Sequence, residues 1–122
     1  MTRRVLITGS RNWEDRATIE TALKQVQAEA GIIRENVTVV HGGARGADRM
    51  AGWIAEQLGM KVEVHPADWD RHGKAAGFIR NQEMVDADID LVLSFNRDDS
   101  AGTRQCTRLA ENAGLEIRRF TA

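Results

Sequence analysis

VTVVHGGARGAD, residues Val37–Asp48, joins a predicted strand to a predicted helix through a glycine-rich turn. The first four residues are β-branched, which favours a strand. The stretch therefore predicts a strand, a tight turn and a helix in direct succession. After the turn, apolar residues recur with the period of an amphipathic helix, at Ala47, Met50, Ala51, Ile54, Ala55 and Leu58.

The glycine turn has the composition of an anion-binding loop. Gly42, Gly43 and Gly46 permit positive φ and let another group approach the backbone closely. The N–H groups at the helix start, from Ala44 to Ala47, carry the positive end of the helix dipole, which suits phosphate. Arg45 adds a guanidinium that can bind phosphate with two hydrogen bonds. The spacing G-G-x-x-G differs from the dinucleotide and P-loop fingerprints, so the alternative is that the glycines serve packing alone.

Strand and helix patterns alternate along the rest of the chain. Gly31 is expected to stop the first helix as a C′ residue. Lys61–His65 alternates in polarity, which indicates a strand near a sheet edge. Pro66–Gly77 is expected to be an irregular loop, and such loops often carry functional side chains, here Trp69. The predicted strands are residues 5–8, 37–40, 61–65, 90–95 and 115–120, and the predicted helices run from about 14 to 30, 47–58, 78–85 and 103–113.

This alternation predicts an α/β sandwich of three layers, with one five-stranded parallel sheet between helices. The pattern leaves two strand orders open, 3-2-1-4-5 and 2-1-3-4-5. In either order, ligands bind beyond the carboxyl ends of the strands. Three of the four segments expected there pair small residues with an arginine or a hydroxyl, which favours an anion site. The four segments are Gly9-Ser10-Arg11, Gly42–Asp48, the Trp69 loop and Ser100–Thr103.

Composition narrows the class of protein. A chain of 122 residues predicts one domain, residues 1–122, and its net charge of −1 argues against a DNA-coating protein. The single cysteine, Cys106, fits a reducing compartment, so a cytoplasmic location is expected. The apolar run Val5–Ile7 is too short for a signal sequence, and no run approaches membrane-spanning length. Scattered histidines offer no metal-ligand spacing, so no metal and no cofactor are expected.

Four segments together resemble the SLOG superfamily, named for Smf/DprA and LOG proteins, and above all its small YspA-like bacterial and phage branch. They read VLITGSRNW, VVHGGARGAD, HPADWDRHGKAAGFIRNQEMV and LVLSFNRDDSAGTRQC, and they cover nearly the whole chain. The resemblance implies a Rossmann-like sheet of order 3-2-1-4-5. It also implies a pocket for a nucleotide or a nucleotide-derived ligand, with phosphate on the glycine turns, and a homodimer.

The resemblance also suggests two alternatives. LOG relatives are phosphoribohydrolases with an arginine-bearing helix and a P-G-G-x-G-T-x-x-E turn. Arg80 matches that arginine and Gly102-Thr103 matches G-T, but Cys106 stands at the glutamate position and P-G-G is absent. Asp48 or Glu83 would then have to supply the catalytic carboxylate. DprA relatives bind single-stranded DNA, which the net charge disfavours here.

Individual side chains have competing interpretations. Arg11 follows the first strand and is interpreted as a phosphate clamp, whereas Ser10 either binds phosphate or shapes the turn. Arg80 and Asn81 point about 100° apart on a helix, so both reach one pocket only near its rim or from a helix start. Trp69 is interpreted as a lid residue that stacks on a base. Cys106 is expected to be a buried core residue, and His41 to lie at the edge of the core. His72 is the better acid–base candidate of the two histidines. Trp13 is expected either to stack on a base or to pack in the core, and Trp53 either to pack or to contact a second subunit.

The sequence therefore predicts a protein that binds a nucleotide or related phosphorylated ligand, with nucleotide hydrolysis and single-strand binding as alternatives. Asp48 and Glu83 are the candidate catalytic residues. The predicted ligand-binding residues are Gly9, Ser10, Arg11, Gly42, Gly43, Ala44, Arg45, Gly46, Asp48, Trp69, Arg80, Asn81, Gly102 and Thr103.

Overall fold

The computed structural model describes residues 1–122 and contains one sheet of five parallel strands in the order β3-β2-β1-β4-β5. This confirms the Rossmann-like α/β fold and, of the two strand orders, 3-2-1-4-5. The short strand β3 lies at one edge, as its alternating polarity predicts. The strands are β1 (Thr2–Gly9), β2 (Asn36–His41), β3 (Lys61–Val64), β4 (Leu91–Asn96) and β5 (Ile117–Thr121).

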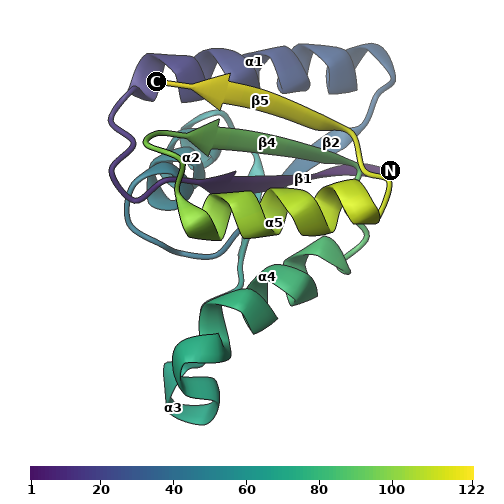
Figure 1. The fold of residues 1–122 in the computed structure, drawn as a ribbon. Coiled ribbons are helices and arrows are strands. Elements are labelled where there is room, and N and C mark those ends of the chain that lie inside the picture. Colours follow the sequence, from purple (N-terminus) through teal and green to yellow (C-terminus); the bar gives the residue numbers. More distant parts are fainter.

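Helices cover both faces of the sheet (Figure 1). Two of them, α1 (Arg16–Ile32) and α2 (Ala47–Gln57), pack on one face, and α4 (Ala76–Val85) and α5 (Ala101–Asn112) pack on the other. The short helix α3 (Trp69–His72) and the 3₁₀ turn Gly73–Ala75 precede α4. In Figure 1, α3 lies at the end of the molecule farthest from the sheet.

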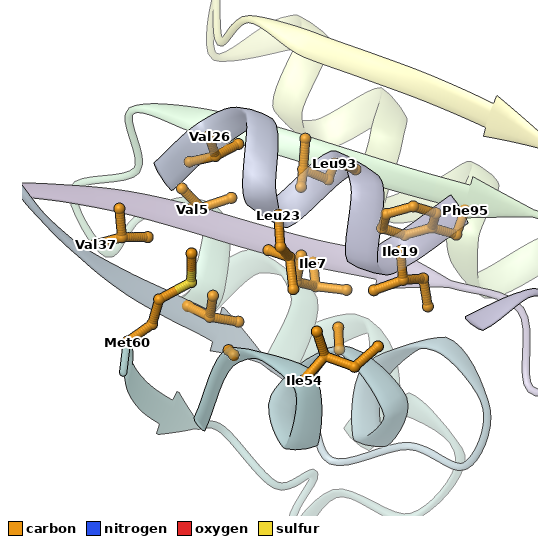
Figure 2. Close-up of a cluster of buried hydrophobic side chains, with 14 of the residues drawn as sticks. Val5, Ile7, Ile19, Leu23, Val26, Val37, Ile54, Met60, Leu93 and Phe95 are labelled. Atoms are coloured by element: carbon orange, nitrogen blue, oxygen red, sulfur yellow. The ribbon is translucent and has the colours of Figure 1, made fainter. Parts of the chain in front are cut away.

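The central strand β1 is buried on both faces, which explains its continuous apolar run. Val5 and Ile7 belong to the larger core with α1 and α2, whereas Leu6 belongs to the smaller core with α4 and α5. Figure 2 shows the larger core, where Ile19 and Leu23 of α1 point toward the sheet. Residues i and i+2 of a strand face the same side, so one short segment serves two cores.

The prediction that Pro66–Gly77 is irregular is wrong, because α3, the 3₁₀ turn and the start of α4 occupy most of it. Asp68 begins α3, and its carboxylate accepts a hydrogen bond from the Arg71 amide (3.1 Å). A capping residue of this kind satisfies a free helix-start amide. Strands β1 and β5 and helices α4 and α5 also begin two or three residues away from their predicted starts.

The first helix does not stop at Gly31 as predicted. It continues to Ile32, and Arg34 takes the left-handed conformation (φ 57°) that a C′ residue needs. The Arg34 amide donates to the Gly31 carbonyl (3.2 Å) and the Glu35 amide to the Ala30 carbonyl (2.9 Å), which is the Schellman pattern. Helices α2 and α5 are each followed by a glycine in the left-handed conformation, Gly59 (φ 79°) and Gly114 (φ 75°).

None of the helices combines the length and the apolar character required to cross a membrane.

Candidate functional site

A pocket of about 490 Å³ opens at the carboxyl end of the sheet, and we call it the main pocket. It lies between the end of β1 and the loop after β4, where the chain turns toward opposite faces, the place at which open α/β sheets bind ligands. Eleven of the predicted ligand-binding residues line it: Gly9, Ser10, Arg11, Ala44, Arg45, Asp48, Trp69, Arg80, Asn81, Gly102 and Thr103.

A second pocket, of about 720 Å³, lies beside the glycine turn, and we call it the arginine pocket. Gly42 and Gly43 line this second pocket, whereas Gly46 lines neither. Glu83 is exposed on α4 and lines neither pocket, so the structure does not bring this candidate carboxylate to the site. The arginine pocket is lined by Arg11, Gly42, Gly43, Ala44, Arg45, Arg49, Val64, Pro66, Ala67, Trp69 and Arg80.

The glycine turn already holds an anion from its own chain. The Asp48 Oδ2 atom accepts hydrogen bonds from the Gly42 amide (3.1 Å) and the Ala44 amide (3.4 Å). The Ala47 amide donates to the Ser10 carbonyl (3.2 Å). The expectation that all the amides from Ala44 to Ala47 are free for phosphate is therefore wrong. The amides of Arg45 and Gly46 donate to no acceptor in the chain.

Asp48 is a buried carboxyl group on the wall of the main pocket. Burial raises its pKa to about 6, against the opposing effects of the Ala44 amide, the Arg80 charge, the Gly42 amide and the Arg11 charge. Both of its hydrogen bonds from the chain go to Oδ2, and Oδ1 accepts none. A carboxyl group with this pKa changes its protonation state close to neutral pH, which is a property of acid–base residues.

Arg80 of α4 forms a hydrogen bond with the glycine turn and holds it in place. Its Nη1 donates to the Gly42 carbonyl (2.7 Å), and its Nε donates to Asn81 Oδ1 (3.0 Å). A Cβ atom on Gly42 would lie 2.3 Å from Nη1, so the group that approaches this glycine closely is the Arg80 side chain. Asn81 in turn donates to Gln105 of α5 (2.8 Å). Arg80 and Asn81, although adjacent on α4, thus both line the main pocket.

The first turn of α5 lies on the wall of the main pocket and carries unpaired hydrogen-bond donors. No side chain caps this helix, although Gly102 and Thr103 of its first turn line the pocket. Thr103 is 1% exposed, and its Oγ1 has no hydrogen-bond partner. Buried hydroxyl groups are nearly always hydrogen-bonded, so an orphan next to free helix amides indicates a missing acceptor.

Ser10 is engaged within the chain. Its Oγ accepts from the Arg97 amide (2.7 Å) and lies 3.0 Å from the Arg97 carbonyl, to which it donates. Asn96 Oδ1 accepts from the Ser100 amide (3.0 Å) in the same loop. These bonds tie the end of β1 to the loop after β4 and fix where α5 begins.

Aromatic and basic side chains form the rim of the main pocket. Trp69 (53% exposed) and Phe78 (54% exposed) stand on α3 and α4 without a packing partner that buries them. Lys74, Phe78 and Arg97 line the pocket although sequence reasoning missed them. The hydrophobic character of the exposed Phe78, at the start of a predicted helix, is the only signal that pointed to any of them.

The other candidates are placed away from the pockets. Trp13 is 2% exposed and its ring packs edge-on against Phe95 (5.5 Å between centroids), so it packs and does not stack on a base. Trp53 is half-exposed, with the Arg16 guanidinium 4.1 Å from its ring centroid. Cys106 is buried, as predicted, and burial raises its pKa to about 11.

The two candidate histidines differ in their surroundings. His41 is buried at the end of β2, and its Nδ1 accepts from the Gly43 amide (2.9 Å). Burial, with the charges of Arg80 and His65, lowers its pKa to about 4, so the ring is neutral at pH 7. His72 ends α3 and lines neither pocket. No group of three or more His, Cys, Asp or Glu side chains gathers into a metal-binding arrangement.

Comparison with known proteins gives one family and one relative. The sequence model of the YspA, cpYpsA-related SLOG family matches residues 3–72, which include the glycine turn. The Gene 61 protein of Mycobacterium phage D29 is 49% identical over 123 residues, an alignment that covers 97% of this chain and 96% of that protein.

Proposed function

Since the chain belongs to the YspA, cpYpsA-related SLOG family, we propose that it binds a nucleotide or nucleotide-derived ligand by a phosphate group in the main pocket. Membership of the family is consistent with a nucleotide-related ligand. The observation that carries the proposal is the orphan hydroxyl of Thr103 at the uncapped start of α5. A phosphate oxygen there would accept from the hydroxyl and from the helix amides at once.

The rest of the pocket supports the same ligand class. Arg11, Arg45 and Lys74 stand on the rim and supply positive charge, and none of them forms an ion pair within the chain. Trp69 and Phe78 offer exposed ring faces on which a base can stack. A phosphate, a ribose and a base are the parts that such a pocket accommodates. A cytoplasmic homodimer, expected earlier, stays a prediction.

The test is a thermal-shift panel on wild type and Thr103→Val. The panel holds nucleoside mono-, di- and triphosphates, cyclic nucleotides, dinucleotides, ADP-ribose and inorganic phosphate. A ligand at 100 times its Kd is expected to stabilise the wild type by about 2.7 kcal/mol. Thr103→Val is expected to weaken that ligand about tenfold or more, since a hydrogen bond to a charged group contributes about 1.5–3 kcal/mol.

Valine matches threonine in shape, and the Thr103 hydroxyl has no partner to lose. The unliganded variant is therefore expected to be at least as stable as the wild type, which separates a binding defect from a folding defect. Arg45→Ala, on an exposed residue, is the second variant and is expected to weaken the same ligand. The absence of any shift across the panel, or full binding by Thr103→Val, would contradict the proposal.

A second candidate function, cleavage of the bound nucleotide, is favoured by Asp48 alone. Its carboxyl group has a pKa of about 6, and its Oδ1 is unpaired on the pocket wall. If Asp48 acts as acid or base, water cleaves the N-glycosidic bond of a bound nucleoside monophosphate and releases the free base and ribose 5-phosphate, and the pH–rate profile has an inflection near pH 6. Asp48→Asn is then expected to retain binding but to lose turnover about 100-fold or more. Unchanged turnover in this variant, or no turnover of any panel member by the wild type, would rule out the role.

A further inference from the structure

The arginine pocket adjoins the main pocket, and the proposed function makes no use of its Arg49 side chain. The two share the walls formed by Arg11, Ala44, Arg45, Trp69 and Arg80. Pockets that share five lining residues lie side by side, which is the arrangement that a ligand with two separate anionic groups requires. We infer that the ligand carries at least two phosphate groups and that the second one lies in the arginine pocket, an inference that rests on the nucleotide site proposed above.

Positive charge is concentrated at the two pockets, although the whole protein carries a slight negative charge. Six basic and two acidic side chains line them, a net charge of +4, whereas the protein as a whole carries −1. The arginine pocket itself has four arginines and no acidic residue. Positive charge gathered in a concave site attracts an anion of matching charge. The basic residues are Arg11, Arg45, Arg49, Lys74, Arg80 and Arg97, and the acidic ones are Asp48 and Asp98.

Three of the four arginines have donors to spare. Arg11, Arg45 and Arg49 form no ion pair within the chain. Arg49 Nε donates to the Gly43 carbonyl (2.9 Å), which orients the guanidinium while its two Nη atoms keep their donors free. An oriented guanidinium with a free Nη pair matches a phosphate in fork geometry.

Arg80, the fourth arginine of the arginine pocket, is engaged within the chain. Arg80 donates to Gly42 and Asn81 and holds the turn between the pockets. The amide of Arg45, which lines the arginine pocket and is unpaired in the same turn, adds a backbone donor to the free guanidinium groups. A single phosphate at the start of α5 would leave the Arg49 guanidinium, which lines only the arginine pocket, without an acceptor.

The ligand class that satisfies both sets is an organic phosphate with two or more phosphoryl groups. Three sources share this chemistry: a nucleoside diphosphate, a nucleoside bisphosphate and a dinucleotide. They differ in the spacing of their phosphates and in the number of bases.

The experiment is isothermal titration of the full chain with four probes: AMP, ADP, adenosine 3′,5′-bisphosphate and the dinucleotide NAD⁺. At least one two-phosphate probe is expected to bind about tenfold or more tightly than AMP, because it gains charge-assisted hydrogen bonds in the arginine pocket. The probe that does so identifies the source. Its affinity is also expected to fall more steeply with salt than that of AMP, since the contacts are between exposed charges.

Arg49→Gln removes one charge from the arginine pocket alone, since Arg49 does not line the main pocket. It is expected to weaken the preferred two-phosphate probe about tenfold and to change AMP less than twofold. The matched control is Arg108→Gln, an exposed arginine of α5 that lines neither pocket, and it is expected to change neither probe.

Equal affinity of AMP and every two-phosphate probe, or equal weakening of both by Arg49→Gln, would overturn the inference and leave the proposed function intact. If no mononucleotide or dinucleotide binds the wild type, both fail together. Tight, Arg49-dependent binding of a single-stranded oligonucleotide without mononucleotide binding would also overturn the inference, because the arginines would then follow a nucleic-acid backbone.

Discussion

Asp48→Asn is expected to raise the free energy of unfolding at pH 7 by up to about 3 kcal/mol, although it removes a carboxylate that two amides bond. Burial raises the pKa of Asp48 from 3.8 to about 6, so this carboxyl group ionises less readily in the folded protein than in the unfolded chain. At neutral pH the ionised carboxylate therefore lowers the free energy of unfolding. Asparagine keeps an oxygen acceptor for the Gly42 and Ala44 amides and carries no charge.

The pH dependence has a definite sign. Because the folded pKa of Asp48 lies above the unfolded value, its contribution to stability is fully present below pH 3.8 and is lost as pH rises through about 6. His41 acts in the opposite sense. Its pKa falls from 6.5 to about 4, so its contribution is present above pH 6.5 and is lost as pH falls through about 4. Between pH 4.5 and 6 the two contributions oppose each other.

Urea unfolding between pH 4.5 and 7 measures the contributions of Asp48 and His41 to the free energy of unfolding. The range starts at 4.5 because Glu63, whose pKa is lowered to about 2 by Arg4 and His65, adds its own pH dependence below that value. Asp48→Asn is expected to become more stable as pH rises, by up to about 3 kcal/mol, since only the His41 contribution remains.

The matched control for this series is His41→Asn, whose oxygen can still accept from the Gly43 amide. It is expected to show the reverse trend, a loss of stability as pH rises to about 6. Parallel pH profiles for the wild type and Asp48→Asn would mean that Asp48 titrates near its ordinary value, and the acid–base role considered for it would lose its support.

Gly46→Ala is expected to lower the free energy of unfolding by about 3 kcal/mol or more. Gly46 has φ 86°, where an L side chain is strained. A Cβ atom there would lie 2.5 Å from both the Ser10 and the Arg11 carbonyl oxygens. Backbone atoms cannot rotate away as a flexible side chain can, so the turn and the β1 end must separate. Denaturant titration measures the loss, and a tryptophan fluorescence transition provides the signal.

Gly31→Ala is the matched control, since it makes the same chemical change in the last turn of α1. No atom lies within 4 Å of the Cβ position there, and its φ is not positive. A stabilisation of about 0.5–1 kcal/mol is expected, because alanine loses less conformational entropy in a helix than glycine does. If Gly46→Ala remained within 1 kcal/mol of the wild type, the close packing of the glycine turn on β1 would not be a constraint on the fold.

Local pattern was sufficient for the type of each long element. The buried run Val5–Leu6–Ile7 and the β-branched run before His41 became strands, and the faces of α1 and α2 packed as their periodicity predicts. Irregular sequence was harder to interpret, since Pro66–Gly77 is polar and glycine-rich but forms α3 through the Asp68 cap. Arg34 likewise ends α1 in a conformation that glycine usually adopts.

The sequence predicts candidate site residues by their positions at the strand ends but does not predict their hydrogen-bond partners. The sequence makes Asp48 a candidate catalytic and ligand-binding residue, and the structure adds that its carboxylate accepts hydrogen bonds from the Gly42 and Ala44 amides of the glycine turn. The sequence predicts that Gly42 lets a ligand approach the backbone, whereas in the structure the Arg80 side chain occupies that position. The sequence does not distinguish Glu83 from Asp48 as the candidate catalytic carboxylate, whereas the structure exposes Glu83 and buries Asp48 on the pocket wall.

The sequence by itself therefore determined the α/β class, the parallel sheet and the glycine turn at its carboxyl edge, because these follow from periodicity and from residues adjacent in the chain. Only the tertiary structure decided which donors are free. Arg80 reaches Gly42 across 38 positions, and Ser10 reaches Arg97 across 87. Contacts of that separation satisfy some amides and leave Thr103 Oγ1 without a partner, and no local pattern encodes which groups remain unpaired.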